Sequence, residues 1–383
     1  MLNNNTAIII GDSYPNTLGL IWSLGKAGIP MVLILVTDND WSRVLKSKYL
    51  NNQEKYLLPS FDSVLEILDD IKARPCEKTI ICSNDRAAEF IDDNENILSK
   101  YYRTPTRGKK IGKYFNKANQ CNLANDCGLV VPQSFIFKKG MTIDRSITFP
   151  VITKPLYSTK GGKENIHICN TVSELEYALT FDRDCPYYLV QKYIEKEFEL
   201  DVLGVRTENG VVWGGAVRKF RHYPPITGAG AYAAIHDVKN YGIETNKVED
   251  FLYRVGYYGL FSVEFVHRDK SNYFMEVNFR NDGLGYAATC AGYNLAAFYV
   301  NSSKKDFLQS FHPIYLMNVS ADKHFVKCGE IKLFIWVKQF LNTSCYIDIN
   351  RHDLKPLFWM SIDRLNRLIR KLFGKSKKHI NQN

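Results

Sequence analysis

The sequence predicts a protein of mixed α/β and α+β class, in which a small parallel α/β domain precedes a β-rich region. Apolar runs of strand length alternate with helical patterns over the first hundred residues. Short β-like runs separated by Gly, Pro and Asn then dominate residues 135–279. The length of 383 residues exceeds what one compact core usually holds, so two or three domains are expected.

The first domain is expected to be a parallel sheet with crossover helices. Ala7–Ile10 and Met31–Val36 are apolar runs of strand length, and Leu18–Ala27 between them has a helical pattern. Thr79–Ile81 predicts another strand, which the polar segment Cys82–Asp85 follows. Such loops at the carboxyl ends of parallel strands are where these sheets bind ligands. Neither a GxGxxG nor a Walker A sequence is present, so no dinucleotide fingerprint or P-loop is predicted.

The composition excludes several classes of protein. Apolar residues make up 45% of the chain, which is enough for packed cores and unlike a disordered protein. The nine cysteines are scattered without a CxxC pair, so we expect no disulfide framework or zinc site and a reducing compartment. The start of the chain lacks the features of a signal peptide, and no apolar stretch approaches the ~20 residues of a spanning helix. We therefore expect a cytoplasmic protein.

The net charge of +10 is concentrated at the C-terminus. Seven basic residues and one acid follow Ser361, so residues 361–383 carry +6 and the rest carries +4. Apolar residues recur there at helical spacing, at Ile362, Leu365, Leu368, Ile369 and Leu372. This segment could lie on the anionic inner face of a membrane, each basic residue contributing ~1 kcal/mol, but a helix docked on the protein is favoured. Nucleic-acid binding is not expected, because the basic run is short and contains few aromatic residues.

The segment Gly259–Arg280 predicts a β-hairpin with two facing carboxylates. A turn centred on Lys270 places Glu264 opposite Glu276, and Asn278 shares a face with Glu276 because side chains alternate with period two. Facing carboxylates repel unless a cation lies between them. Together with a carboxamide oxygen, they form a ligand set for Mg²⁺ bound through its nucleotide. A solvated hairpin face with two acids by chance is equally compatible with the spacing.

Two further segments have features of a phosphate site. The strand Phe149–Pro155 carries Lys154 and precedes a Gly-rich turn, Ser158–Lys163. Backbone N–H groups of such turns can approach phosphate oxygens, and the lysines add positive charge. A third segment, the strand Tyr188–Ile194, runs into the acid-rich Glu195–Glu199. Taken singly, an ordinary turn and an ordinary strand explain these segments as well.

The order of these segments resembles the ATP-grasp superfamily over roughly residues 110–300. Within it, the chain is similar to the carbamoyl-phosphate-synthase-like and D-aspartate-ligase-like carboxylate–amine ligases. Phe149–Pro155 resembles the P-x-V-x-K-P strand of the family. Glu264-Phe265 and the later Met275–Arg280 resemble its closing E-F … E-x-N-x-R signature. Asn116-Lys117 resembles the family's D-K pair, with asparagine in place of aspartate.

The resemblance implies an ATP-grasp fold, in which two α+β subdomains clasp ATP, preceded by the small parallel α/β domain. The expected boundaries are 1–110 for the first domain, 111–305 for the ATP-grasp domain and 306–383 for a C-terminal extension that ends in the basic amphipathic helix. Arg221–Gly230 is expected either to border the acceptor site or to be a plain hairpin connection.

The resemblance also implies a role for each matching position. Val190–Ile194 resembles the linker whose backbone reads adenine, and either Glu197 or Glu199 would hold the ribose hydroxyls. The implied nucleotide-binding residues are Lys117, Lys154, Ser158, Gly161, Gly162, Gln191, Lys192, Tyr193, Ile194, Glu197 and Glu199. The implied metal ligands are Glu264, Glu276 and Asn278. The implied catalytic residues, which stabilise the transferred phosphoryl group, are Arg280 and Arg218.

The implied activity is that of a ligase. ATP and two Mg²⁺ ions, with Mn²⁺ as an alternative metal, would activate a small-molecule carboxylate as an acyl phosphate, and an amine would then form an amide. Cell-wall and surface-polysaccharide precursors are among the acceptors considered. One alternative is an ATP-grasp enzyme that ends at phosphorylation or carboxylation. Another is a non-catalytic nucleotide-binding protein at the membrane periphery.

Overall fold

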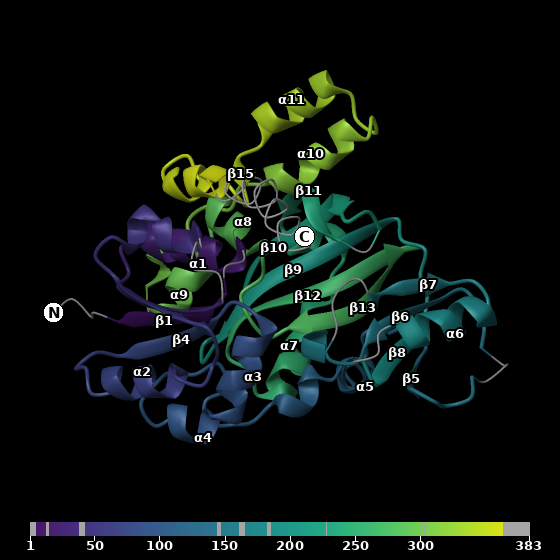
Figure 1. Ribbon diagram of the computed structural model, residues 1–383, viewed down its shortest axis with the longest axis horizontal. Coiled ribbons are helices and arrows are strands. Elements are labelled where there is room, and N and C mark those ends of the chain that lie inside the picture. The colour runs from purple at the N-terminus through teal and green to yellow at the C-terminus, as the bar shows by residue number, and fades with distance from the viewer. Residues whose placement is uncertain are drawn as a thin grey trace, which may run out of the picture.

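Three sheets form the protein, which is described by a computed structural model (Figure 1). Its described residues are 5–12, 15–37, 43–143, 147–160, 165–181, 185–226, 228–301 and 304–362. The N-terminal sheet and a small third sheet lie on either side of a seven-stranded central sheet (Figure 1). Parallel strands in the first sheet and antiparallel pairing in the small one confirm the predicted mixture of α/β and α+β structure.

The N-terminal sheet is parallel, with strand order β3-β2-β1-β4. Its strands are β1 (Thr6–Gly11), β2 (Met31–Val36), β3 (Glu54–Leu58) and β4 (Lys78–Cys82). Its helices are α1 (Pro15–Lys26), α2 (Val64–Ile71), α3 (Asp85–Asp93) and α4 (Glu95–Leu98). Helices pack on both faces, so Ile8, Ile9 and Ile10 are all buried, which explains the continuous apolar run. The edge strand β3 was not predicted, because its charged Glu54 and Lys55 interrupt the apolar pattern.

The small sheet has strand order β5-β8-β6-β7 and is antiparallel. Its strands are β5 (Ser134–Lys138), β6 (Val151–Pro155), β7 (His167–Cys169) and β8 (Tyr187–Lys192). The helix α6 (Val172–Phe181) buries Leu175 and Leu179 against one face of this sheet. The other face packs Leu189 on α5 (Lys117–Asp126).

The central sheet has strand order β13-β12-β9-β10-β11-β14-β15. Its strands are β9 (Phe198–Thr207), β10 (Gly210–Tyr223), β11 (Ala229–His236), β12 (Gly259–Arg268), β13 (Ser271–Asn278), β14 (Ile314–Met317) and β15 (Cys345–Tyr346). One face packs on α7 (Thr245–Val255), and the other packs on α1, α8 (Gly285–Cys290) and α9 (Leu295–Val300). β14 and β15 come from the expected C-terminal extension, as do α10 (Val319–Lys327) and α11 (Leu333–Asn342). The domain boundaries near 110 and 305 stay predictions.

None of the helices in the described part of the chain has the length and apolar character that a membrane-spanning helix needs. The α10–α11 pair stands out from the body of the protein at the top of the view in Figure 1. Its base is tied to β10, because the buried Asp322 of α10 binds Arg221 through two contacts of 2.7 Å.

Candidate active site

The predicted hairpin and its facing carboxylates are confirmed. Glu264 of β12 pairs directly with Glu276 of β13. The turn itself contains only Asp269 and Lys270, both with positive φ, and such a two-residue turn alone would set Glu264 opposite Met275. A β-bulge between Glu264 and Phe265 shifts the register by one residue and brings the two glutamates together.

Lys117 binds Glu276 from the N-terminus of α5. Its ammonium group donates to Glu276 Oε2 and, over 2.9 Å, to Ser158 Oγ. Asn116 caps the helix, since its side-chain oxygen accepts from the N–H groups of Ala118 at 2.9 Å and Asn119 at 3.2 Å. Asparagine at this position therefore caps the helix, although the family's pattern has aspartate there.

The α5 helix connects the small sheet to the hairpin. The Gln120 side chain donates to Val277 O over 3.1 Å and accepts from Val277 N over 2.7 Å. These two bonds satisfy backbone groups of β13, which is an edge strand of the central sheet. The small sheet, α5 and the hairpin lie next to one another in Figure 1. Lys117 of α5 makes the contact to Glu276 of the hairpin.

Lys154 lies on the same face of the small sheet as Gln191. Its ammonium group donates to Gln191 Oε1 over 3.5 Å. Burial lowers the pKa of Lys154, although the nearby Glu276 carboxylate opposes the shift. Burial by itself raises the pKa of Glu276, but the Lys117 and Lys154 ammonium groups outweigh it and hold this pKa well below its usual range. Glu276 is therefore an anion stabilised by two cations, the buried Lys117 and the partly buried Lys154.

The oxygen atoms of the hairpin fit a magnesium site. Glu264 and Glu276 supply carboxylate oxygens, the ligands that Mg²⁺ prefers. The Asn278 amide nitrogen donates to Glu264 Oε1 over 3.2 Å, while its oxygen accepts from Arg280 Nη2 over 3.0 Å. The amide nitrogen, and not the oxygen, therefore faces the carboxylates, and the role of Asn278 as a metal ligand stays a prediction.

Arg280 connects the hairpin to the N-terminal domain. Its Nε donates over 2.6 Å to Oδ1 of Asp85, in the polar segment that follows β4. Burial alone lowers the pKa of Arg280, but Asp85 and Asp282 raise it further above its already high value. The side chain is therefore a permanent cation beside Asn278. The polar loop after β4 was expected to face a ligand, and it lies at this site through Asp85.

A second charged group lies on β9 and β10 and includes residues that sequence reasoning missed. Lys219 Nζ lies 2.7 Å from Asp201 Oδ1 and 3.5 Å from Glu199 Oε2. Asp201 pairs with Glu264 in the adjacent strand, so this group continues the face of the hairpin carboxylates. Burial raises the pKa of Asp201, and the Glu264 carboxylate adds to the shift. The signal in the sequence was the alternation Glu199, Asp201 along a strand.

The expectation for Arg218 is corrected by strand alternation. Arg218 is adjacent to Lys219 and therefore points to the opposite face of β10. Its guanidinium lies 4.3 Å from the centre of the Phe198 ring, away from the carboxylates. The structure does not bring Arg218 to the hairpin site, and Lys219 is the cation of this strand that faces it.

Glu197 and Glu199 have different surroundings. Glu199 Oε2 lies 2.9 Å from His222 Nε2, and Oε1 lies 2.6 Å from Lys196 Nζ. Burial by itself raises the pKa of Glu199, but His222, Lys219 and Lys196 bring it below its usual range. Glu197 is about half exposed and accepts from Asp269 N over 3.2 Å. Glu197 therefore has the more accessible carboxylate. His222 lies in Arg221–Gly230, which forms the β10–β11 connection and also borders this group.

The expected adenine linker follows β8. The N–H of Lys192 donates to Gln133 O over 2.8 Å, and that of Tyr193 donates to Pro150 O over 3.0 Å. In the part of the chain that the structure describes, the N–H of Ile194 makes no hydrogen bond. Ile194 is therefore the linker residue with a backbone donor to offer.

The turn after β6 covers the site. Ser158 accepts from Lys117, and Thr159 Oγ1 donates to Glu89 Oε1 of α3 over 2.7 Å. A cavity of about 20 Å³ lies beneath, lined by residues of α3, α5, β13 and this turn. That volume holds about one water molecule. The expected phosphate-binding Gly161 and Gly162 lie outside the described residues.

Comparisons with known proteins find similar solved structures but no similar sequence. No protein-family model matches the sequence, and no curated protein matches it. The L-amino acid ligase from Bacillus licheniformis is similar, with a TM-score of 0.62, 13% identity and coverage of 81% of this chain and 79% of that one. N5-carboxyaminoimidazole synthetase from Staphylococcus aureus complexed with ADP has a TM-score of 0.64, 15% identity and 85% coverage of both chains.

A third similar structure is the biotin carboxylase domain of Hydrogenobacter thermophilus 2-oxoglutarate carboxylase in complex with MgADP. Its TM-score is 0.58, with 16% identity and coverage of 81% of this chain and 73% of that one. These ligases and carboxylases are ATP-grasp enzymes. The predicted architecture is confirmed: this chain has the ATP-grasp fold.

Proposed function

We propose that the protein is an ATP-dependent carboxylate–amine ligase that works through an acyl phosphate. One observation carries the proposal. Glu264, Glu276 and Asn278 share one face of the hairpin, and Glu276 binds the buried Lys117 and is stabilised by the charge of Lys154 on the small sheet. Carboxylates for a divalent ion next to cations for phosphates are what phosphoryl transfer needs, since its catalysis is mostly positioning and charge neutralisation.

Each group has a proposed task in this site. Lys117 and Lys154 neutralise nucleotide phosphates, the Ile194 N–H binds adenine and Glu197 holds the ribose hydroxyls. Two Mg²⁺ ions, or Mn²⁺ in their place, held by Glu264, Glu276 and Asn278, supply charge neutralisation at the phosphates.

The transferred phosphoryl group needs cations on its other side. Arg280, held by Asp85, stabilises it there. Lys219 takes the task that the sequence suggested for Arg218, because Lys219 shares the face of Glu264. The acceptor then lies near the charged residues Glu199, Asp201 and Lys219. A precursor of the cell wall or of a surface polysaccharide is among the candidate acceptors.

A screen for ADP release tests the reaction class. We expect ADP to form only when a suitable amino acid or other amine accompanies a small carboxylate. Hydroxylamine should trap the acyl phosphate when the amine is omitted. The negative control is Lys154→Met, which we expect to reduce ADP release at least ~100-fold, because the proposed phosphate-binding charge is lost.

Carboxylation is the second candidate, favoured by the similarity to N5-carboxyaminoimidazole synthetase and a biotin carboxylase domain. ADP release that requires bicarbonate in place of an organic carboxylate would select it over the ligase. ATP binding without ADP release under either condition would exclude both the ligase and the carboxylase activity. It would indicate a non-catalytic nucleotide-binding protein.

We also propose peripheral contact with an anionic membrane through residues 361–383, at the inner face. The described part of the extension supports this. Leu333, Phe334 and Leu341 of α11 are 63%, 68% and 70% exposed, an unusual density of exposed apolar side chains for one short helix. The exposed Lys332 precedes these apolar residues, and the exposed Lys338 lies between Phe334 and Leu341. Residues beyond Ser361 add +6 in the sequence, although nearly all of them lie outside the described residues.

Vesicle co-sedimentation tests the membrane contact. The full chain should sediment with vesicles containing anionic phosphatidylglycerol and remain in the supernatant with neutral phosphatidylcholine. Truncation after residue 360 should weaken binding at least tenfold, because each lost basic residue removes ~1 kcal/mol of attraction. Equal sedimentation with both lipids, or no effect of the truncation, would contradict the proposal.

A further inference from the structure

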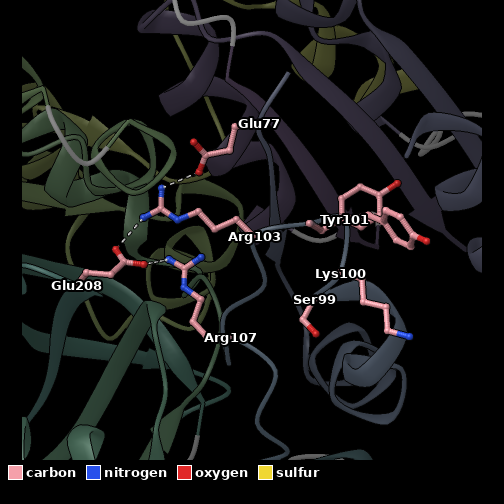
Figure 2. A pocket seen from close by; sticks show the side chains of 8 residues that line it. Glu77, Ser99, Lys100, Tyr101, Arg103, Arg107 and Glu208 are labelled. Atoms are coloured by element: carbon pink, nitrogen blue, oxygen red, sulfur yellow. Dashed lines mark hydrogen bonds and ion pairs between the residues drawn. The ribbon is translucent and has the colours of Figure 1, made fainter. Parts of the chain in front are cut away.

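An open cavity is lined by Arg103, Arg107 and Glu208 together with five other residues, none of which belongs to the hairpin site (Figure 2). It has a volume of about 520 Å³, within the range of small-molecule sites. Its walls come from the N-terminal domain, from the segment between that domain and α5, and from the β9–β10 turn. Glu208 in that turn is nine residues beyond Glu199 on β9, which corresponds to roughly 30 Å along an extended strand. The cavity is therefore separate from the nucleotide site.

Two arginines converge on one carboxylate in this cavity (Figure 2). Arg107 Nη2 lies 2.5 Å from Glu208 Oε1, and Arg103 Nη2 lies 3.3 Å from Glu208 Oε2. Arg103 Nη1 also lies 3.5 Å from Glu77 Oε1. The arginine side chains are 10% and 22% exposed, whereas those of Glu77 and Glu208 are about half exposed. The cations belong to the walls, and the carboxylates lie at the solvent side.

The arginines are held in place independently of Glu208. The Arg103 guanidinium lies 5.1 Å from the centre of the Tyr299 ring, and the Arg107 guanidinium lies 5.7 Å from that of Tyr258. The backbone of Arg107 has a φ of 52°, in the left-handed region. A non-glycine residue keeps this conformation only where the surrounding structure holds it. Two guanidinium groups that stay in position without their carboxylate form a ready site for an anion.

Glu208 does not satisfy the donors of Arg107. The Nε of Arg107 is buried and has no hydrogen-bond partner among the described residues. A guanidinium carries five N–H donors, and a buried donor without an acceptor has a cost in stability. An anion with more acceptor oxygens than one carboxylate, placed between the arginines, would recover that cost. The Lys100 ammonium group belongs to the same cavity and adds positive charge.

We propose that this cavity binds a small anion, carrying a phosphate or carboxylate group, that displaces the Glu208 carboxylate from Arg103 and Arg107. The bound anion would release the β9–β10 turn from Arg103 and Arg107, because it replaces the Glu208 contacts that join them. Both strands of that turn lead back to the charged group of Glu199, Asp201 and Lys219. The cavity is thus placed to act as an effector site, and its ligand binding does not depend on the proposed ligase reaction.

Calorimetric titration of the full chain with inorganic phosphate and with succinate, at constant ionic strength, tests the site. Arg107→Gln should weaken binding of the preferred anion about tenfold, because a charge-assisted bond is lost. Glu208→Gln should tighten it severalfold, because the competing carboxylate loses its charge while its shape remains. Arg254→Gln is the matched control, since Arg254 forms an exposed ion pair with Asp250 outside the cavity and should leave binding unchanged.

The two anions distinguish a phosphorylated ligand from a carboxylate ligand. The anion whose affinity changes in both Arg107→Gln and Glu208→Gln identifies the class. Phosphate bound at the nucleotide site would be the same in all variants, so only differences between variants report on the cavity. The proposal is overturned if Glu208→Gln weakens binding or leaves it unchanged for both anions. It is also overturned if neither anion binds the wild-type chain.

Discussion

Glu276→Ala is expected to abolish ATP-dependent turnover, with a loss of at least about 10²–10³-fold. Glu276 faces Glu264 across the hairpin and binds Lys117. Its removal takes away a proposed metal ligand and leaves Lys117 and Lys154 without the anion that stabilises them. Loss of one preorganised charge-stabilising group costs about this much in other enzymes. ADP release with the substrates found in the screen measures the effect.

Two further variants separate chemistry from folding. Glu276→Gln keeps the shape and loses the charge, so it should be nearly as inactive as Glu276→Ala. The matched control is Glu244→Ala, which removes an exposed glutamate paired with Lys247 and should keep full activity. Circular dichroism should show that all three proteins are folded. Normal turnover of folded Glu276→Ala would refute the metal assignment.

Lys219→Met is expected to lower the free energy of unfolding by about 3–5 kcal/mol. Lys219 and Asp201 form a 2.7 Å ion pair in which both side chains are 5% exposed. Removing one partner of a buried pair leaves an uncompensated charge, which is much costlier than the pair itself is worth. Urea unfolding monitored by tryptophan fluorescence measures the change. Turnover should also fall, because Lys219 shares the face of Glu264.

The double variant Asp201→Asn with Lys219→Met provides the decisive comparison. It removes both charges, so it should recover most of the stability that Lys219→Met loses. Lys338→Met, on the exposed surface of α11, should have an unfolding midpoint close to that of the wild type. If Lys219→Met matched Lys338→Met, the buried pair would contribute nothing to the fold.

Local patterns in the sequence were sufficient for several elements. The apolar runs at Met31–Val36 and Thr79–Ile81 became strands, and the spacing of Glu264 and Glu276 became a facing pair. These elements depend on contacts between residues close in sequence, so periodicity describes them. The Glu276 register was correct although its turn was not centred as expected, because the bulge compensated for the shorter turn.

The prediction for Arg218 was wrong for a reason that lies in the tertiary structure. Alternation along a strand places adjacent side chains on opposite faces, but only the pairing of β10 with β9 decides which face meets Glu264. The sequence therefore indicated a cation on this strand without selecting Lys219 over Arg218. The cavity at Arg107 and Glu208 is likewise invisible in the sequence, because its walls are about one hundred residues apart.

Lys117 was implied by the resemblance to the ATP-grasp superfamily. By itself, the sequence determined the class of the fold, the hairpin and the strand that carries Lys154. These follow from hydrophobic period and local spacing, which short stretches of chain already contain. Only the tertiary structure decided which charged residues share a face and that Asp85 holds Arg280 across domains. It also decided that strands from beyond residue 305 complete the central sheet. The physical reason is that such contacts join segments far apart in the chain, whose relative placement depends on how the three sheets pack.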